Sequence, residues 1–260
     1  MTGIVVDFNR PMPVFPLEGV VLLPHAVQPL HIFERRYRQM VSRCLSEAEH
    51  GGGQIALASF VPRPEGPLGK GDRSDDAQSS LVADEDDGAS AGGGQWRQLR
   101  PIVCVGHIIR HEELEGGRYN ILLQGVCRAR IVEVDEPDSD RLYHQVRLRP
   151  IGVEQVPEDS IAYARTTLRA MLRGPQLRRM SNARTVIDWI QRSEVPTAAV
   201  VEIASFALVF DEEMRYRLLA EPSLEARVRL LREELARLAC LVRRGDRQSW
   251  RDWPKGMSWN

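Results

Sequence analysis

Two patterns of apolar and polar positions divide the chain. From Val14 to about Val153, apolar residues come in short runs of strand length, bounded by Gly, Pro and charged residues. The runs are VVLL, QIALASF, PIVCVGHII, YNILLQG, CRARIVEV and YHQVRLRPI. After Pro157 the apolar residues recur every three or four positions, as in helices that bury one face. The pattern predicts an α+β chain, with a β domain over residues 1–153 and a helical bundle over 154–246.

Glycines and one helical stretch refine the picture of the first half. Gly116 and Gly117 lie between two apolar runs and predict a hairpin, because glycine accepts the positive φ of tight turns. Gly125 separates ILLQ from VCRARIVEV and predicts a bulge or a sharp bend. One helix is expected at about 29–50. Its apolar face would consist of Phe33, Tyr37, Met40, Val41, Cys44 and Leu45.

The second half predicts four helices. The first begins at Glu158, Asp159 and Ser160, which would supply a cap and an acidic first turn. The others cover Arg184 to Arg192, Thr197 to about Phe210, and the residues from Ser223 onward. The last helix has an apolar stripe that fits either a coiled-coil seam or one helix docked in a bundle, and its short length favours docking. The stripe is Leu224, Val228, Leu231, Leu235, Leu238 and Val242.

Two segments fit neither half. Residues 62–95 are rich in Gly, Ser, Asp and Pro and offer little apolar surface, which predicts a disordered insertion between two strands. Residues 247–260 form a tail that contains Trp250, Trp253 and Trp259. These tryptophans would either anchor a partner or pack back on the chain itself.

Composition and charge exclude few functions. The chain is 43% apolar with a formal net charge of −1, so no overall field draws it to nucleic acid or to a membrane. We find no signal-peptide pattern, and the longest apolar run, Ala198 to Phe210, is too short to span a bilayer. The four cysteines have no metal-site spacing and are expected in the core. We therefore expect a cytoplasmic protein without membrane contact; oligomeric state is not indicated.

The histidines do not form a convincing catalytic or metal site. His107 and His111 have a spacing that would bind zinc on a helix, with Glu112 following, but the segment is expected to be a strand. His25 and His31 flank an extended segment and have no third ligand nearby. There is no phosphate-binding loop around Lys70 and no nucleophile elbow. We expect no catalytic residue, no cofactor and no metal.

Arginines on one predicted helix offer a different function. Arg165, Arg169 and Arg173 recur every four residues, and no acidic residue occurs from Ile161 to Ile187. The spacing would suit an acidic or nucleic-acid partner, although a solvated helix face explains it more simply.

The opening stretch, PVFPLEGVVLLPHAVQPLHIFERRYRQMV, resembles the start of the Lon substrate-binding domain, which also occurs in stand-alone proteins and in cereblon. Further similarities are VCVGHIIRHEELEGGRYNILLQGVCRARI and the helical segment that begins EIASFALVF. The resemblance covers roughly residues 11–245. Its signature positions are Pro29, Phe33, Glu34, Arg36, Tyr37, Gly106, Tyr119 and Gly125.

The resemblance implies a PUA-like pseudobarrel followed by a helical bundle. It also implies a non-enzymatic module that binds unfolded or degradation-targeted polypeptides, or a protease or chaperone partner, without the ATPase and protease modules of Lon. Nucleic-acid binding through the PUA-like barrel is the alternative. From the residues themselves, we expect Phe33 and Tyr37 to face the barrel. Glu34 would pair with Arg38 or lie buried against an arginine.

Overall fold

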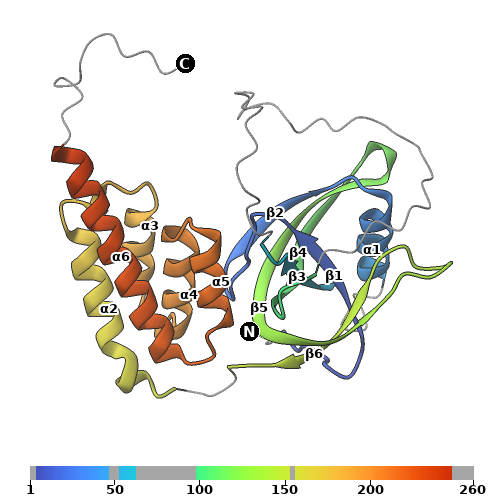
Figure 1. Cartoon of the computed structure of the whole chain (residues 1–260), viewed down its shortest axis with the longest axis horizontal. Coiled ribbons are helices and arrows are strands. Elements are labelled where there is room, and N and C mark those ends of the chain that lie inside the picture. The colour runs from blue at the N-terminus through green and yellow to red at the C-terminus, as the bar shows by residue number, and fades with distance from the viewer. Residues whose placement is uncertain (1–3, 47–52, 63–97, 153–155, 248–260) are drawn as a thin grey trace, which may run out of the picture.

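The computed structural model describes residues 4–46, 53–62, 98–152 and 156–247. They form an α+β fold, as the sequence predicts, with strands rolled together on one side and most helices stacked on the other (Figure 1). We call residues 4–152 the β lobe and residues 156–247 the helical lobe. The predicted insertion and Trp-rich tail lie almost wholly outside the described residues, and so does the boundary at 153. The predicted division into domains therefore stays a prediction.

The β lobe is a mixed sheet that closes on itself. Its strands are β1 (Met12–Leu17), β2 (Val27–Ile32), β3 (Gln54–Ser59), β4 (Ile102–Leu114), β5 (Arg118–Asp135) and β6 (Gln145–Pro150). The order is β2-β5-β4-β3-β1-β6, and β5 also pairs with β6, which closes the barrel. β1 and β3 are parallel, and the other pairs are antiparallel. Among the strands of the described residues, β2 pairs with β5 alone, so it is an edge strand.

The predicted hairpin and bulge are both confirmed. β4 and β5 are joined by a short 3-10 turn, η2 (Glu115–Gly117), in which Gly116 and Gly117 have φ of 75° and 70°. Farther along, Val105 pairs with Cys127 but Gly106 pairs with Gly125, so one residue of β5 bulges out. The runs YNILLQG and CRARIVEV are thus one long strand with an irregularity in the middle.

The VVLL run was wrongly predicted as a strand. Leu22 and Leu23 are fully buried in the barrel core, yet their segment belongs to no strand. The chain is held there at the β5 bulge, where His25 N–H donates to the Gly125 carbonyl oxygen at 2.8 Å. A Cβ atom at Gly125 would lie 2.1 Å from the Leu23 carbonyl oxygen, so this close approach requires glycine.

The first helix, α1 (Arg35–Ser46), begins later than predicted, because Pro29 lies in β2. An edge strand tolerates proline, since the missing N–H removes no bond on the unpaired side. Tyr37 faces the core as predicted, with its ring 4.5 Å from that of Phe15. Phe33 precedes the helix and is 52% exposed, so its predicted core position is wrong. The predicted end of the helix near residue 50 falls outside the described residues.

The helical lobe follows the predicted elements closely. The four predicted helices are all present, as α2 (Glu158–Arg173), α3 (Ala183–Gln191), α4 (Thr197–Leu208) and α6 (Leu224–Arg247). The residue at the cap position of α2 is Pro157, which makes no side-chain cap bond. α6 is docked in the lobe core, through Leu224, Val228, Leu231 and Leu235. A second 3-10 turn, η3 (Leu177–Arg179), follows α2.

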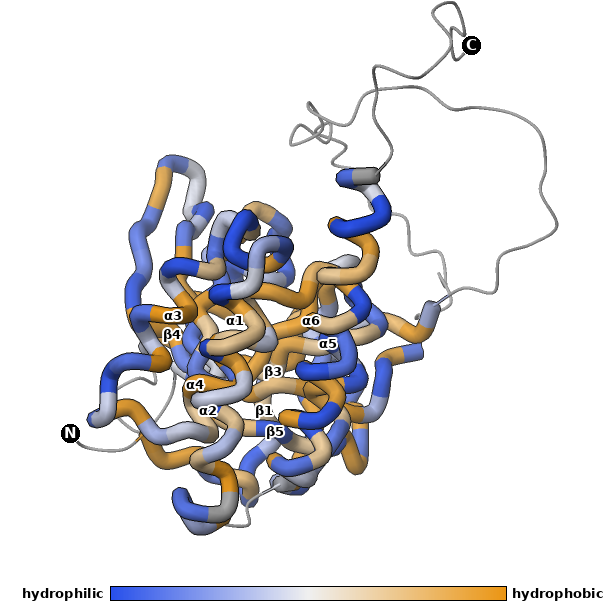
Figure 2. The backbone as a smooth tube through the Cα atoms, turned by 90° about the vertical axis from the view of Figure 1, so that its left-hand side faces the viewer, coloured by the Kyte–Doolittle hydropathy of each residue, from blue (hydrophilic) through white to orange (hydrophobic). Residues whose placement is uncertain are grey.

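One helix, α5 (Glu212–Ala220), was missed. Asp211 caps it by accepting a hydrogen bond from Met214 N–H at 2.7 Å. α5 joins the lobes, because Tyr216 Oη accepts a bond from Ile102 N–H of β4 at 3.1 Å and Leu219 enters the barrel core. In Figure 2 hydrophobic segments run through the interior of the molecule, and the projecting turns are mostly hydrophilic.

Candidate functional site

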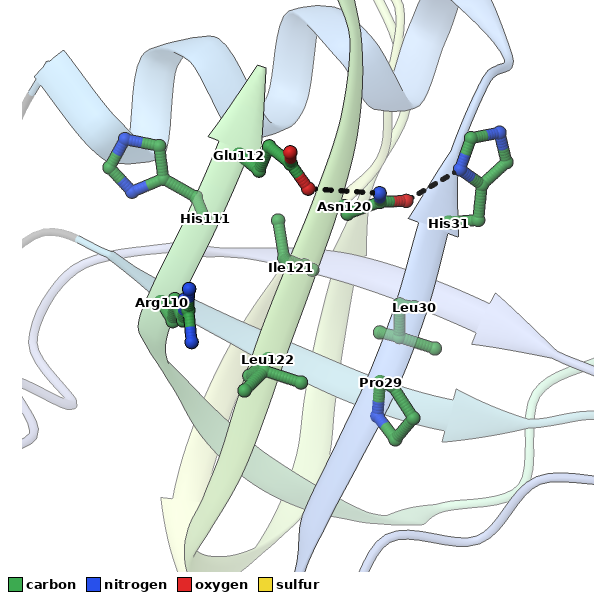
Figure 3. A pocket seen from close by; sticks show the side chains of 9 residues that line it. All are labelled: Pro29, Leu30, His31, Arg110, His111, Glu112, Asn120, Ile121 and Leu122. Atoms are coloured by element: carbon green, nitrogen blue, oxygen red, sulfur yellow. Dashed lines mark hydrogen bonds between the residues drawn. The ribbon is translucent and has the colours of Figure 1, made fainter. Parts of the chain in front are cut away.

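The outward face of β2, β5 and β4 carries a hollow of about 460 Å³, which we call the outer groove (Figure 3). Each of the three strands contributes three consecutive residues. The lining consists of Pro29, Leu30, His31, Arg110, His111, Glu112, Asn120, Ile121 and Leu122. Ile121 itself faces the barrel core and is 2% exposed, so the side chains beside it on β5 form the floor of the groove.

Strand register arranges the groove in two rows. Pro29 and Arg110 both stand opposite Leu122, in a row that combines apolar surface with one cation. Two residues farther along β5, His31 and Glu112 both stand opposite Asn120 in a polar row. Residues two apart on a strand share a face, so both rows lie on the outer surface.

Hydrogen bonds hold the polar row in place. Asn120 Oδ1 lies 2.8 Å from His31 Nδ1, and Asn120 Nδ2 donates to Glu112 Oε2 at 3.3 Å. Phe33 extends the groove beyond β2, because its exposed ring stacks on His31 with centroids 6.1 Å apart. An exposed aromatic ring, a leucine and fixed polar groups are the features of a surface that binds another chain.

The histidines considered in the sequence as possible metal ligands lie in β2, in the loop before it and in β4. His107 and His111 lie in β4 as predicted, separated by a register irregularity between Ile108 and Arg110. Figure 3 shows His111 pointing away from the polar row. Within the part of the chain that the structure describes, no three His, Cys, Asp or Glu side chains group as a metal site would require.

The charged signature residues take other positions than expected. Glu34 pairs with Arg36, whose Nη2 lies 2.7 Å from Glu34 Oε2, and both side chains are about half exposed. The expected pairing of Glu34 with Arg38, or its burial, is therefore wrong. Arg38 instead donates to the Gly116 carbonyl oxygen, which ties α1 to the β4–β5 turn.

The remaining signature residues have architectural positions. Tyr119 is buried in the barrel core. A Cβ atom at Gly106 would lie 2.5 Å from the Leu123 side chain, so only glycine lets that side chain fill the core as it does.

The three arginines of α2 are not equivalent. Arg165 is half buried and donates to Thr197 Oγ1 at 2.7 Å and to the Ile190 carbonyl oxygen at 2.8 Å. Arg169 and Arg173 are exposed. Trp250, Trp253 and Trp259 lie outside the described residues. A partner-binding role for these arginines and tryptophans stays a prediction.

The cysteines fit their expected place only in part. Cys44 and Cys104 are buried, Cys127 is half buried, and Cys240 is exposed, contrary to the prediction. Burial raises the pKa of the Cys104 thiol, and raises that of Cys127 to about 11, so both thiols stay protonated near neutral pH. Protonated thiols are poor nucleophiles.

Two features were missed in the sequence. The outer groove depends on the register between strands, which no local pattern in the sequence predicts. The second feature is a buried cluster between the lobes, Arg128, Glu202 and Arg227. Glu202 gave a signal, since it is a carboxylate inside an otherwise apolar helical run, and a buried charge needs a partner.

Comparisons with known proteins agree with this architecture. The family model for the ATP-dependent protease La (LON) substrate-binding domain matches residues 11–237. The N-terminal domain of Mycobacterium avium complex Lon protease is similar, with a TM-score of 0.58, 16% identity, and coverage of 87% of this chain and 98% of that one. A Lon N-terminal domain protein from Xanthomonas campestris gives a TM-score of 0.50 and 19% identity, covering 85% and 96%. No curated protein sequence matches.

The fold and the family match together define a substrate-binding module. The chain belongs to the LON substrate-binding domain family. This family is a substrate-binding domain and not a catalytic one, which supports a substrate-binding role in general. Among the described residues, no helix is long and apolar enough to cross a membrane.

Proposed function

We propose that this protein is a non-enzymatic module that binds unfolded or degradation-targeted polypeptide segments in the outer groove. The observation that carries the proposal is the groove itself, in a chain of a substrate-binding family. Phe33 and Leu122 would supply apolar contacts. The polar row would donate hydrogen bonds to an extended backbone and accept hydrogen bonds from it, because the amides of an unfolded chain are unpaired.

The position of the groove favours an extended ligand. It lies along β2, an edge strand whose second side has no strand partner among the described residues. An extended peptide can add to such an edge, with backbone hydrogen bonds giving affinity and neighbouring side-chain positions giving selectivity. Pro29 removes one donor on β2, which limits the edge to a few backbone bonds and suits weak binding of many sequences.

The test is binding of fluorescently labelled β-casein, an unfolded polypeptide, measured by anisotropy. The double variant Phe33→Ser/Leu122→Ser should weaken binding about tenfold, because the exposed Phe33 ring and the partly exposed Leu122 side chain are both lost as apolar contacts. Val132→Ser is the matched control, since Val132 is an exposed apolar residue of the same strand outside the groove. Equal binding by the double variant would exclude the groove, and absence of wild-type binding would exclude the function.

Nucleic-acid binding is the alternative function. Of the three arginines that would carry it, Arg169 and Arg173 are exposed. RNA binding through them would weaken steeply with salt and would be lost in Arg169→Gln/Arg173→Gln. A protease or chaperone component as the partner would be recovered by crosslinking in cell extract, with and without residues 247–260.

A further inference from the structure

A second hollow of about 730 Å³, the interlobe cleft, lies where the β lobe meets the helical lobe. Its volume is in the range of small-molecule sites. It is lined by the loop before β2, by β5 beyond the bulge, and by the first turns of α4 and α6. Four charged residues, Arg128, Glu202, Glu225 and Arg227, line it together with apolar residues.

The cleft is lined by more buried positive charges than buried negative ones. Arg128 Nη2 lies 2.6 Å from Glu202 Oε2, and Arg227 Nε lies 2.9 Å from Glu202 Oε1. All three side chains are at most 7% exposed. Two guanidinium groups thus share one carboxylate, and the cluster carries one buried positive charge in excess. Buried charges are normally matched, so the excess calls for an anion.

Each guanidinium also keeps donors that no described group accepts. Arg128 donates from Nε to the Leu219 carbonyl oxygen, and from Nη2 to the Glu202 carboxylate and the Leu218 carbonyl oxygen. Arg227 uses Nη1 for the carbonyl oxygens of Glu221 and Pro222. Within the described residues, no partner is found for Arg128 Nη1 or Arg227 Nη2, and both residues line the cleft. The Arg227 Nε contact with Glu202 is an ion pair without hydrogen-bond geometry.

Two helices point their amino ends at the same place. Ala198 in the first turn of α4 and Leu224 and Glu225 in the first turn of α6 line the cleft. First-turn amides have no partner within their own helix, and the helix dipole is positive at this end. Thr197 N–H already donates to the Glu158 carboxylate and Ala226 N–H to Ser223 Oγ, so only the remaining first-turn amides add to the attraction that the buried arginines exert on an anion.

We propose that the interlobe cleft binds a carboxylate carried on an apolar body. The cleft wall is polar and apolar in about equal parts, and its apolar part includes Val126, Ile151, Val156, Ala198 and Leu224. One excess positive charge matches a singly charged carboxylate better than a doubly charged phosphate, and guanidinium groups bind carboxylates with strong hydrogen bonds. The carboxyl terminus of a polypeptide and a free apolar acid both offer this chemistry.

Acidic neighbours set a limit on the affinity. Glu225 is exposed and lines the cleft, so its charge opposes an incoming carboxylate. His25 also lines the cleft, and its pKa is lowered, chiefly by loss of solvent, so the ring is neutral near pH 7. Removing the charge of Glu225 should therefore strengthen binding, which a purely structural cluster would not show.

The experiment compares ligands that differ at one group. An N-acetylated peptide ending in Leu-Leu-Ala with a free carboxyl terminus is titrated by calorimetry against the same peptide as a carboxamide. We expect the free carboxyl form to bind at least about tenfold tighter. Equal affinity of the two forms overturns the proposal. If N-acetyl-leucine competes with the peptide, the site accepts free acids as well as chain ends. If it does not compete, the site accepts chain ends alone.

Variants then locate the effect in the cleft. Glu225→Gln should tighten binding of the carboxyl form about two- to fivefold. Glu233→Gln, an exposed position on the same helix outside the cleft, is the control and should change nothing. If Glu225→Gln leaves the preference for the free carboxyl form unchanged, the peptide does not bind in the interlobe cleft and the proposal is overturned. The inference does not rest on the outer groove, because casein binding by Phe33→Ser/Leu122→Ser tests that function separately.

Discussion

The outer groove and the interlobe cluster are both built from three polar side chains, and they differ in burial. In the groove, His31, Asn120 and Glu112 are exposed on the sheet surface. Between the lobes, Arg128, Glu202 and Arg227 are almost fully buried. Water can replace any lost partner in the groove, whereas a lost partner in the cluster leaves an isolated charge in a medium of low polarity. The polar row of the outer groove is thus free to bind a ligand, whereas the buried cluster of Arg128, Glu202 and Arg227 holds the two lobes together.

The same strand contributes to both. β5 places Asn120 in the groove and Arg128 in the cluster, with the bulge at Gly125 between them. The bulge shifts the register of β5 against β4 by one residue. A one-residue shift exchanges the faces of all side chains beyond it, so the bulge is what lets one strand serve an outer and an inner site.

The largest expected effect comes from breaking the buried cluster. Glu202→Gln leaves two guanidinium groups without their shared carboxylate and should lower the free energy of unfolding by about 3–5 kcal/mol. Urea unfolding followed by circular dichroism measures the loss. Glu34→Gln is the matched control, because its pair with Arg36 is about half exposed, and it should cost less than about 1 kcal/mol. Similar losses in both variants would contradict the difference between buried and exposed pairs.

The next effect concerns the bulge. Gly125→Ala places a methyl group 2.1 Å from the Leu23 carbonyl oxygen, and backbone must shift to relieve the contact. We expect a loss of about 3 kcal/mol, at the upper end for overpacking. Gly245→Ala, in α6 with nothing within 4 Å of the added atom, should instead stabilise by about 0.5–1 kcal/mol. Both are read from urea midpoints, and a neutral Gly125→Ala would show that the bulge can relax.

A smaller effect is expected in the outer groove. Asn120→Ala removes both bonds of the polar row and should lower the free energy of unfolding by less than about 1 kcal/mol, because solvent replaces them. Casein affinity should fall in the same variant. A loss of several kcal/mol would mean that the polar row is part of the framework and not a binding surface.

How much the sequence predicts differs between the lobes. Helical periodicity is local, so the helices at Glu158 and Leu224 follow from their apolar stripes and first turns. α5 escaped because its apolar residues do not gather on one face, whereas those of α3, a helix of the same length, do. The cap Asp211 and the acidic residues after it were a usable signal. In the β lobe, Gly116 and Gly125 were informative because glycine geometry is also local.

What failed in the β lobe depends on contacts between distant segments. Phe33 fits the helical period of Tyr37 and Met40, but pairing of β2 with β5 ends the strand just before it and leaves its ring outside. The VVLL run has strand composition, yet its backbone bonds to the β5 bulge in place of a ladder. The partners of Glu202 come from β5 and α6, which no local pattern links.

A pH-dependent effect tests a contact that joins one buried and one exposed side chain, His144 with Glu136. The His144 side chain is 10% exposed and that of Glu136 is 73% exposed, with Nε2 2.8 Å from the carboxylate oxygen. Burial lowers the pKa of His144, Glu136 raises it, and Arg36 and Arg141 lower it further. Below its ordinary value of 6.5, the unfolded chain therefore binds a proton that the folded chain does not, and stability falls as the pH falls.

Urea unfolding at several values between pH 8 and pH 5 measures this dependence. The contribution of one proton to the slope is at most about 1.4 kcal/mol per pH unit, and His144→Gln should remove it below pH 6.5 while leaving the slope above pH 7 unchanged. A wild-type protein that becomes more stable than the variant as the pH falls would mean that Glu136, although exposed, outweighs burial. The distinction between exposed and buried partners would then fail for this pair.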